Sequence, residues 1–232
     1  MKRILFIFLT LALLISDNLF AQRDNFLGEF YFGAGASALA TRVDFLPSVP
    51  QTLKIGVSGG IAAKYVSQRN LGLIVEANYS QRGWEEEFDP ESGFSYNRTL
   101  NYIEIPFMTH VYFGNKTRFI INAGPQISYL LSENHEMSQA LSDDIDARRE
   151  ANPDRTIGYQ YNPFSEMQKV DYGLVGGMGI EIQTGIGNFD LEGRYYFGLG
   201  DIFTSRRSEN AYFGRSAHRL IEGKLTYYIK IR

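Results

Sequence analysis

Three histidines are the residues of this chain best suited to acid–base chemistry: His110, His135 and His218. His110 and His218 lie near carboxylates in the pattern described below, and a histidine beside a carboxylate can act as a general base. Such catalysis also needs an adjacent nucleophile, and the sequence places none beside either histidine. We therefore expect both rings to be held by polar neighbours, and we predict that the chain is not an enzyme and needs no cofactor.

Glu104 is the second candidate, because its position in the pattern matches those of Arg82, Arg194 and Lys224. A carboxylate among these cations could form a gated ion pair in a small channel. It could equally form part of a polar network that closes the interior of a barrel. We expect the network, because a barrel of the predicted size leaves no open aqueous pore.

A third group is the acidic run Asp143, Asp144 and Asp146, whose carboxylates resemble calcium ligands. The spacing and the central glycine of a helix–loop–helix calcium site are absent. The alternative is a short helix capped by Ser142 and ending at residues 152–153, Asn-Pro, with its charges on the wet face. The sequence favours the helix or a mobile loop, and we predict no metal site.

Aromatic residues are concentrated in the segments predicted as long loops. On outer loops such residues could bind a protein or glycan, or pack on the rim of the fold and on lipid headgroups. Both interpretations stay open. The candidates for partner binding are Trp84, Phe94, Tyr96, Tyr159, Tyr161 and Phe164, with Phe88 beside them.

The element that positions these residues is best seen in residues 100–114, which change face at every step. Ile103, Ile105 and Phe107 fall on one side of an extended chain, and Glu104 and His110 fall on the other. The run is longer than an ordinary soluble strand of about 5 to 6 residues. It matches a tilted strand of about 9 to 11 residues that crosses a bilayer.

About eight such runs are present, and the segments between them alternate long and short. The runs are 26–40, 55–65, 71–82, 100–114, 118–131, 171–182, 189–199 and 221–231. The pattern predicts an all-β fold, an eight-stranded antiparallel transmembrane β-barrel of up-and-down meander type. Its short turns would face the periplasm and its long loops the outside. A soluble barrel also alternates, but with its apolar face inward.

The glycines decide between the two orientations. If the polar faces pointed outward, bulky apolar side chains would overfill the narrow interior, and Gly173, Gly177 and Gly179 would lie on the surface. Lipid outside and charge inside is the better solution. The predicted polar network of the lumen comprises Glu76, Arg82, Glu104, His110, Glu192, Arg194, Glu222 and Lys224.

The start of the chain predicts export. Lys2 and Arg3 precede an apolar run from Ile4 to Ile15 that is too short to span a bilayer as a helix, and Ala21 follows. We expect residues 1–21 to be a signal peptide and residues 22–232 to form the barrel domain of the bacterial outer membrane. The chain has no Cys, a formal net charge of −3 and a mean hydropathy of −0.22. We expect outer-membrane lipid around it and no nucleic-acid partner.

Several segments resemble the bacterial outer-membrane β-barrel family labelled PorT-like or porin-like. They are NYSQRGW (78–84), LNYIEIPF (100–107), NAGPQISYLL (122–131), DYGLVGGMGIEI (171–182) and LEGRYYFGLGDI (191–202). The resemblance implies the barrel fold, and one branch of the family is linked to protein secretion. The acidic insertion 132–168 departs from the family pattern. We expect a non-enzymatic barrel that presents loops for adhesion, envelope integrity or binding of an envelope or extracellular protein. A secretion accessory and an outer-membrane enzyme acting on lipid or peptide are the alternatives.

Overall fold

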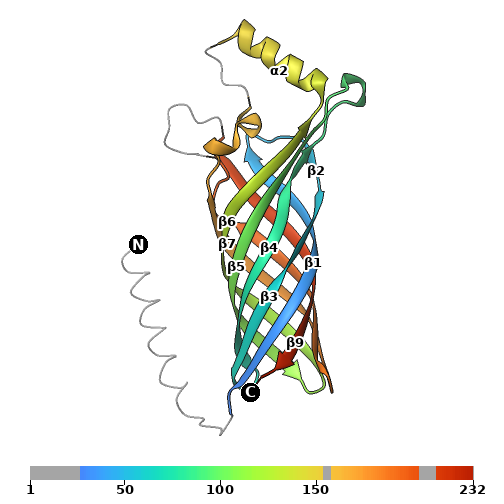
Figure 1. Cartoon of the computed structure of the whole chain (residues 1–232), viewed down its shortest axis with the longest axis vertical. Helices are drawn as coiled ribbons and strands as arrows, with labels where there is room; N and C mark the ends of the chain where they lie inside the picture. The colour runs from blue at the N-terminus through green and yellow to red at the C-terminus, as the bar shows by residue number, and fades with distance from the viewer. Residues whose placement is uncertain (1–26, 154–157, 204–212, 232) are drawn as a thin grey trace, which may run out of the picture.

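Eight long strands close into an antiparallel ring in a computed structural model that describes residues 27–153, 158–203 and 213–231 (Figure 1). They are β1 (Glu29–Leu46), β3 (Lys54–Gln68), β4 (Leu71–Glu86), β5 (Tyr96–Gly114), β6 (Thr117–Met137), β7 (Val170–Thr184), β8 (Gly187–Gly198) and β9 (Arg215–Lys230). Each pairs with the strand that follows it, and β1 pairs with β9 to complete the ring. The predicted eight-stranded up-and-down barrel is confirmed.

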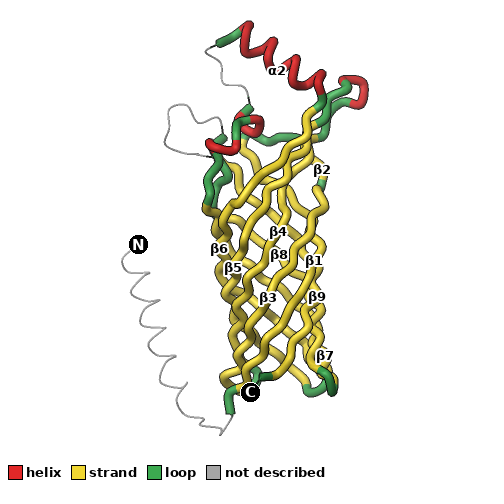
Figure 2. Tube along the Cα trace, in the orientation of Figure 1, coloured by secondary structure: helices red, strands yellow, loops and turns green. Residues whose placement is uncertain are grey.

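The connections differ between the two ends of the barrel (Figure 2). Turns of two residues, at 69–70, 115–116 and 185–186, lie at the end where β1 begins and β9 finishes. Long segments join the strands at the other end, where β2 (Gln51–Thr52) adds two residues beside β4. Outer-membrane barrels have this asymmetry, with the short turns on the periplasmic side.

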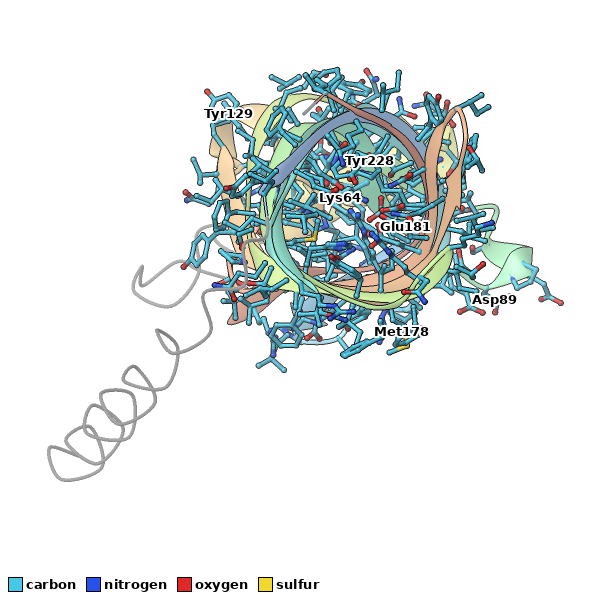
Figure 3. All side chains as sticks on the ribbon, turned by 90° about the horizontal axis from the view of Figure 1, so that it is seen from below. Lys64, Asp89, Tyr129, Met178, Glu181 and Tyr228 are labelled. Atoms are coloured by element: carbon cyan, nitrogen blue, oxygen red, sulfur yellow. The ribbon has the colours of Figure 1, made fainter. Side chains whose placement is uncertain are left out.

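Alternation along each strand sorts the side chains between two environments. In β5, Ile105 and Phe107 are about half exposed on the outer wall. Met108 and His110, which occupy alternate positions of the same strand, are fully buried. Seen along the barrel, Tyr129 and Met178 point outward, and charged side chains fill the interior (Figure 3). The apolar face is therefore the outer one, as the glycine argument predicted.

The apolar outer band has the height of a bilayer core. On β1 it runs from Phe30 to Ala40, and the next outward residues are Arg42 and Asp44. Ten residues rise about 25 Å when a strand with about 3.4 Å per residue is tilted by about 40°. This matches the apolar band of about 25 Å in outer-membrane barrels. Positions beyond Ala40 therefore lie at or above the headgroups.

β5 and β6 continue well beyond the predicted strand ends. Residues 96–99 and 132–137 were expected in loops, but Tyr96 pairs with Met137 at the outer end of one ladder. The alternation of the sequence continues through this part, and both faces remain half or fully buried at residues 96–100. The hairpin therefore projects from the membrane and supports the longest connection.

Helix α2 (Gln139–Ala151) begins where β6 ends (Figure 1). Its N-cap is Ser138, whose hydroxyl accepts a hydrogen bond from the Leu141 amide, so the predicted cap at Ser142 was wrong by one turn. The predicted end is confirmed, because Asn152 caps the helix. Short 3-10 helices η1 (Pro90–Ser92), η2 (Tyr159–Tyr161) and η3 (Phe164–Glu166) complete the outer end. No described helix is long and apolar enough to cross a membrane.

Candidate functional site

The lumen is filled by three layers of charged side chains, and the lowest is centred on Lys64 of β3. Its ammonium group contacts Glu181 of β7 and lies 3.2 Å from Asp190 of β8. Arg118 reaches the same Glu181 at 3.0 Å. The Tyr228 ring lies 4.1 Å from the Lys64 ammonium group, in a cation–π arrangement (Figure 3). β3 and β7 are four places apart in the ring, so this contact spans the full width of the barrel.

The middle layer joins Arg194 of β8 to Glu76 of β4 through two hydrogen bonds of 2.9 and 3.0 Å. Arg194 also lies 2.8 Å from Glu192, and the Lys224 ammonium group lies 2.6 Å from Glu76. All four side chains are at least 98% buried. Charged groups are found at such depth when they are paired and hydrogen-bonded, and this layer satisfies both conditions.

The upper layer is centred on Arg82, which connects four strands. Its guanidinium group binds Glu104 at 2.6 Å, Asp171 at 2.8 Å and the Ser128 hydroxyl at 3.1 Å. The rings of Tyr102 and Tyr196 lie within 5 Å of the same group, and the Tyr196 hydroxyl donates to Asp171. The planar guanidinium group suits this site, since it offers five donors and two stacking faces.

The residues predicted for the lumen network all lie on the inner face, but they do not form one cluster. Glu104 contacts Arg82 as expected, whereas Arg194 and Lys224 bind Glu76 one layer lower. Glu222 lies opposite Arg194 in the β8–β9 ladder and is half-buried.

An apolar plug closes the lumen above the charged layers. It includes Trp84 and Tyr96, which the sequence analysis expected on exposed loops, together with Phe45, Phe203 and Phe213. Trp84 is fully buried and meets Phe45 edge-on with ring centroids 5.4 Å apart. The expectation of exposure was wrong for Trp84 and Tyr96 because β4 and β5 continue past the membrane and turn these side chains inward.

A clamp fastens the segment around η2 over this plug. Arg98 of β5 donates to the carbonyl oxygens of Gln160 and Asn162, each at 2.8 Å, and to Glu133 of β6 at 3.0 Å. The Tyr96 hydroxyl donates to the Gln160 carbonyl at 2.9 Å. A buried guanidinium group thus replaces the water that would otherwise solvate these loop carbonyls.

A second tether to the same segment joins Tyr161 to Glu86. The Tyr161 hydroxyl donates to the Glu86 carboxylate at 2.7 Å. Burial raises the pKa of Glu86 above its ordinary value, although the bond from Tyr161 opposes this shift. Burial and the nearby Glu86 charge raise the pKa of Tyr161, so its proton stays on the hydroxyl. The segment is therefore held by groups from both β4 and β5.

The other predicted binding aromatics differ in their surroundings. Phe94 is half-buried and packs edge-on against Phe88, with ring centroids 5.9 Å apart. Tyr161 is half-buried against the plug. The side chains of Tyr159 and Phe164 lie outside the described part of the structure.

The model of the outer membrane protein beta-barrel domain family matches residues 20–204. This chain belongs to that family. Among solved structures, the outer-membrane barrel resembles neisserial surface protein A at 15% identity and a TM-score of 0.48, covering 87% of this chain and 97% of that one. OprG of Pseudomonas aeruginosa matches at 11% identity with a TM-score of 0.46, and the match covers 88% of this chain and 93% of OprG. Ail of Yersinia pestis, crystallised with a heparin analogue, matches at 11% identity with a TM-score of 0.40. The match covers 88% of this chain and 100% of Ail. No curated protein sequence matches.

The predicted signal peptide lies outside the described residues.

The histidines of this outer-membrane barrel are arranged for packing. His110 Nδ1 lies 2.7 Å from the Asn122 side-chain oxygen, and His218 Nε2 lies 3.3 Å from the Tyr102 hydroxyl. Both rings are fully buried in the lumen. His135 is about half exposed beside Glu133. The described contacts of the two buried rings therefore go to an amide and a phenol, and neither is a serine nucleophile of the kind a hydrolase needs.

The acidic run of the barrel lies on the wet face of α2. Asp144 pairs with Arg148 at 2.7 Å, and Asp143 accepts a hydrogen bond from Gln139. Leu141 and Ile145 are the buried residues of the helix and pack against the plug. In the described residues, no group of three His, Cys, Asp or Glu side chains could hold a metal ion.

Arg98 is a site residue that the pattern of eight runs does not predict, and it fastens the segment around η2 at the outer end of the barrel. Its signal was present, because Tyr96, Arg98 and Leu100 continue the inward positions of β5. A strand that is expected to stop at the membrane ends before residue 98, whereas β5 begins at Tyr96.

Proposed function

We propose that this protein is a sealed, non-enzymatic outer-membrane barrel that presents a rigid outer surface to an extracellular or envelope protein. The observation that carries the proposal is the Arg98 clamp, with its two bonds of 2.8 Å to the carbonyl oxygens of Gln160 and Asn162. A loop that only connected two strands would need no buried guanidinium group. Ordering a loop before binding lowers the entropy lost in the complex.

A sealed lumen follows from the layers. At three heights a contact joins strands four places apart in the ring of eight: Lys64 to Glu181, Arg194 to Glu76, and Tyr102 to His218. The purified barrel in a planar bilayer should give no large steady conductance. Large steady currents would contradict the sealed lumen.

The exposed face of α2 is the best candidate for partner contact. It carries Asp143, Asp146, Arg149 and Glu150 in solvent, with both signs of charge present. We would place a photo-crosslinking residue at Arg149 and, as a matched control, at Ile186 in an exposed periplasmic turn. In intact cells a discrete adduct is expected from Arg149 and not from Ile186. The adduct should weaken in Arg98→Met, which frees the clamped segment. Equal adducts from both positions would contradict the proposal.

An accessory role in protein secretion is the second candidate, supported by the resemblance of the strand segments alone. The periplasmic turns would then contact the secretion machinery, so the Ile186 crosslinker would give the discrete adduct. A lipid- or peptide-modifying enzyme is supported least, because His110 and His218 are buried in the lumen. Alanine at both positions would abolish activity if they were catalytic.

A further inference from the structure

Three arginines occupy outward positions of β1 and β9 where these strands leave the apolar band. Arg42 follows Ala40 on the outward face of β1, and Arg219 and Arg215 follow Ile221 on β9. Arginine on a lipid-facing wall destabilises a barrel by about 2–4 kcal/mol at the bilayer centre and by about 0–1 near the headgroups. The apolar band of about 25 Å ends at Ala40 on β1, and Arg42 is the next outward residue. The arginines therefore lie at headgroup level in the outer leaflet.

Arg42 lies directly opposite Arg219 in the β1–β9 ladder. Like charges in this position destabilise a sheet. Arg42 is exposed, and in the described part of the chain no ion pair to it is found. Arg42 and Arg215 both repel the Arg219 charge. The pair is thus an unfavourable one that a bound anion would make favourable.

Arg219 is only 7% exposed and is held rigidly in place. Its guanidinium group lies 3.8 Å from the centre of the Phe197 ring and donates to the carbonyl oxygens of Gly198 and His218. Asp44 is the one carboxylate in contact with the described cluster, at 3.1 Å from Arg219 and 3.3 Å from Arg215. Three cations and one anion leave a net charge of about +2.

A hollow of about 230 Å³ opens beside the two arginines. Arg42 and Arg219 form its charged rim, and the other lining residues are Ala40, Leu53, Tyr195 and Ile221. Leu53, Tyr195 and Ile221 are each about half exposed on the outer wall, where lipid chains would meet them. The hollow therefore combines an apolar wall toward the bilayer core with guanidinium groups at headgroup height.

We propose that Arg42 and Arg219, assisted by Arg215, bind a phosphate monoester on the headgroup of an outer-leaflet lipid. Guanidinium groups bind phosphate oxygens in a two-point geometry. A phosphate monoester carries a charge of about −1.5 to −2 at neutral pH, which balances the net charge of the cluster, whereas a phosphodiester carries only one. The acyl chains of the lipid would lie along the apolar wall. The site is separate from the loop surface proposed above.

The test is titration of the full-length barrel in detergent with lipid A carrying two phosphate monoesters, followed by native mass spectrometry. Arg42→Gln is the main variant, because this side chain is exposed and supports no described packing. Arg69→Gln, on an exposed periplasmic turn, is the matched control. We expect binding of the first lipid to weaken about tenfold in Arg42→Gln and to stay unchanged in Arg69→Gln. Arg219→Gln should weaken binding at least as much, with folding checked by heat-induced gel shift.

Three outcomes would overturn the proposal. The first is unchanged lipid A binding in Arg42→Gln. The second is equally tight, Arg42-dependent binding of phosphatidylglycerol, because a diester would then suffice. The third is inorganic phosphate that binds as tightly as lipid A, because the lipid portion would then contribute nothing.

Discussion

Arg194 and Glu76 are joined by two hydrogen bonds although they stand on β8 and β4, four places apart in a ring of eight strands. Two side chains from opposite walls therefore meet at the barrel axis. The pair bridges the lumen at this level. The finding separates this protein from open porins, whose larger rings leave an aqueous channel.

Glu76→Ala should destabilise the barrel strongly, because it leaves Arg194 and Lys224 without a shared anion in a buried layer. Removing one partner of a buried pair typically lowers the free energy of unfolding by about 3–5 kcal/mol. Urea unfolding in lipid vesicles measures the change. Lys230→Ala is the control, because its pair with Glu29 is half exposed and should contribute about 0–1 kcal/mol. Equal effects of the two variants would show that the lumen network is not stabilising.

Gly177→Ala should also destabilise the barrel. A Cβ atom at residue 177 would lie 2.6 Å from Arg194 Cγ and 2.7 Å from the Gly193 carbonyl oxygen. Overpacking of this kind costs about 1–3 kcal/mol. Gly193→Ala is a matched control on the adjacent strand, because nothing lies within 4 Å of its added Cβ. The same unfolding assay should find the control close to wild type, and a stable Gly177→Ala protein would mean that the lumen can relax.

Arg98→Met should free the segment around η2 while leaving the barrel intact. The substitution removes charge-assisted bonds to Gln160, Asn162 and Glu133, each worth about 1.5–3 kcal/mol. Loss of even about 2 kcal/mol lowers hydrogen-exchange protection of residues 158–168 about 30-fold. Arg148→Ala on the exposed face of α2 should leave that protection unchanged. Protection that persists in Arg98→Met would rule out the clamp.

The attachment of this segment should weaken as pH rises. Burial raises the pKa of Glu86 above its ordinary 4.5, so the folded protein holds this proton more tightly than the unfolded chain. The stabilising contribution of Glu86 is thus full below about pH 4.5 and is lost as pH rises through the raised pKa. Hydrogen-exchange protection of residues 158–168, corrected for intrinsic rates, should fall across that interval in wild type. In Glu86→Gln this protection should stay constant with pH, and at neutral pH it should be higher than in wild type. A flat wild-type profile would contradict the assignment.

The sequence predicts which face each barrel residue occupies, because a strand has a period of two. It does not predict which residues meet across the lumen. Glu104 was expected near Arg82, Arg194 and Lys224, yet only Arg82 lies in its layer. The height of each residue along the barrel axis depends on the tilt and stagger of all eight strands. Tilt and stagger are set when the barrel closes, and no single strand encodes them.

The outer end was predicted less well, for a different physical reason. The membrane sets the length of the apolar outer band, and it does not set where pairing stops. Trp84, Tyr96 and Arg98 lie on inward strand positions beyond that band, where Trp84 and Tyr96 join an apolar cluster and Arg98 binds the loop above it. The cap at Ser138 was missed because the helix begins directly after β6, with no intervening loop.

The cross-lumen contacts of Lys64, Arg194 and Arg82 all come from strands, and none of these three residues belongs to a long connection. The charged layers of the lumen and the long outer connections are thus encoded by separate parts of the gene. Mutation and insertion in segments such as 138–169 leave these contacts untouched. A lineage under pressure to change its exposed surface would therefore keep the charged layers of its lumen through each change.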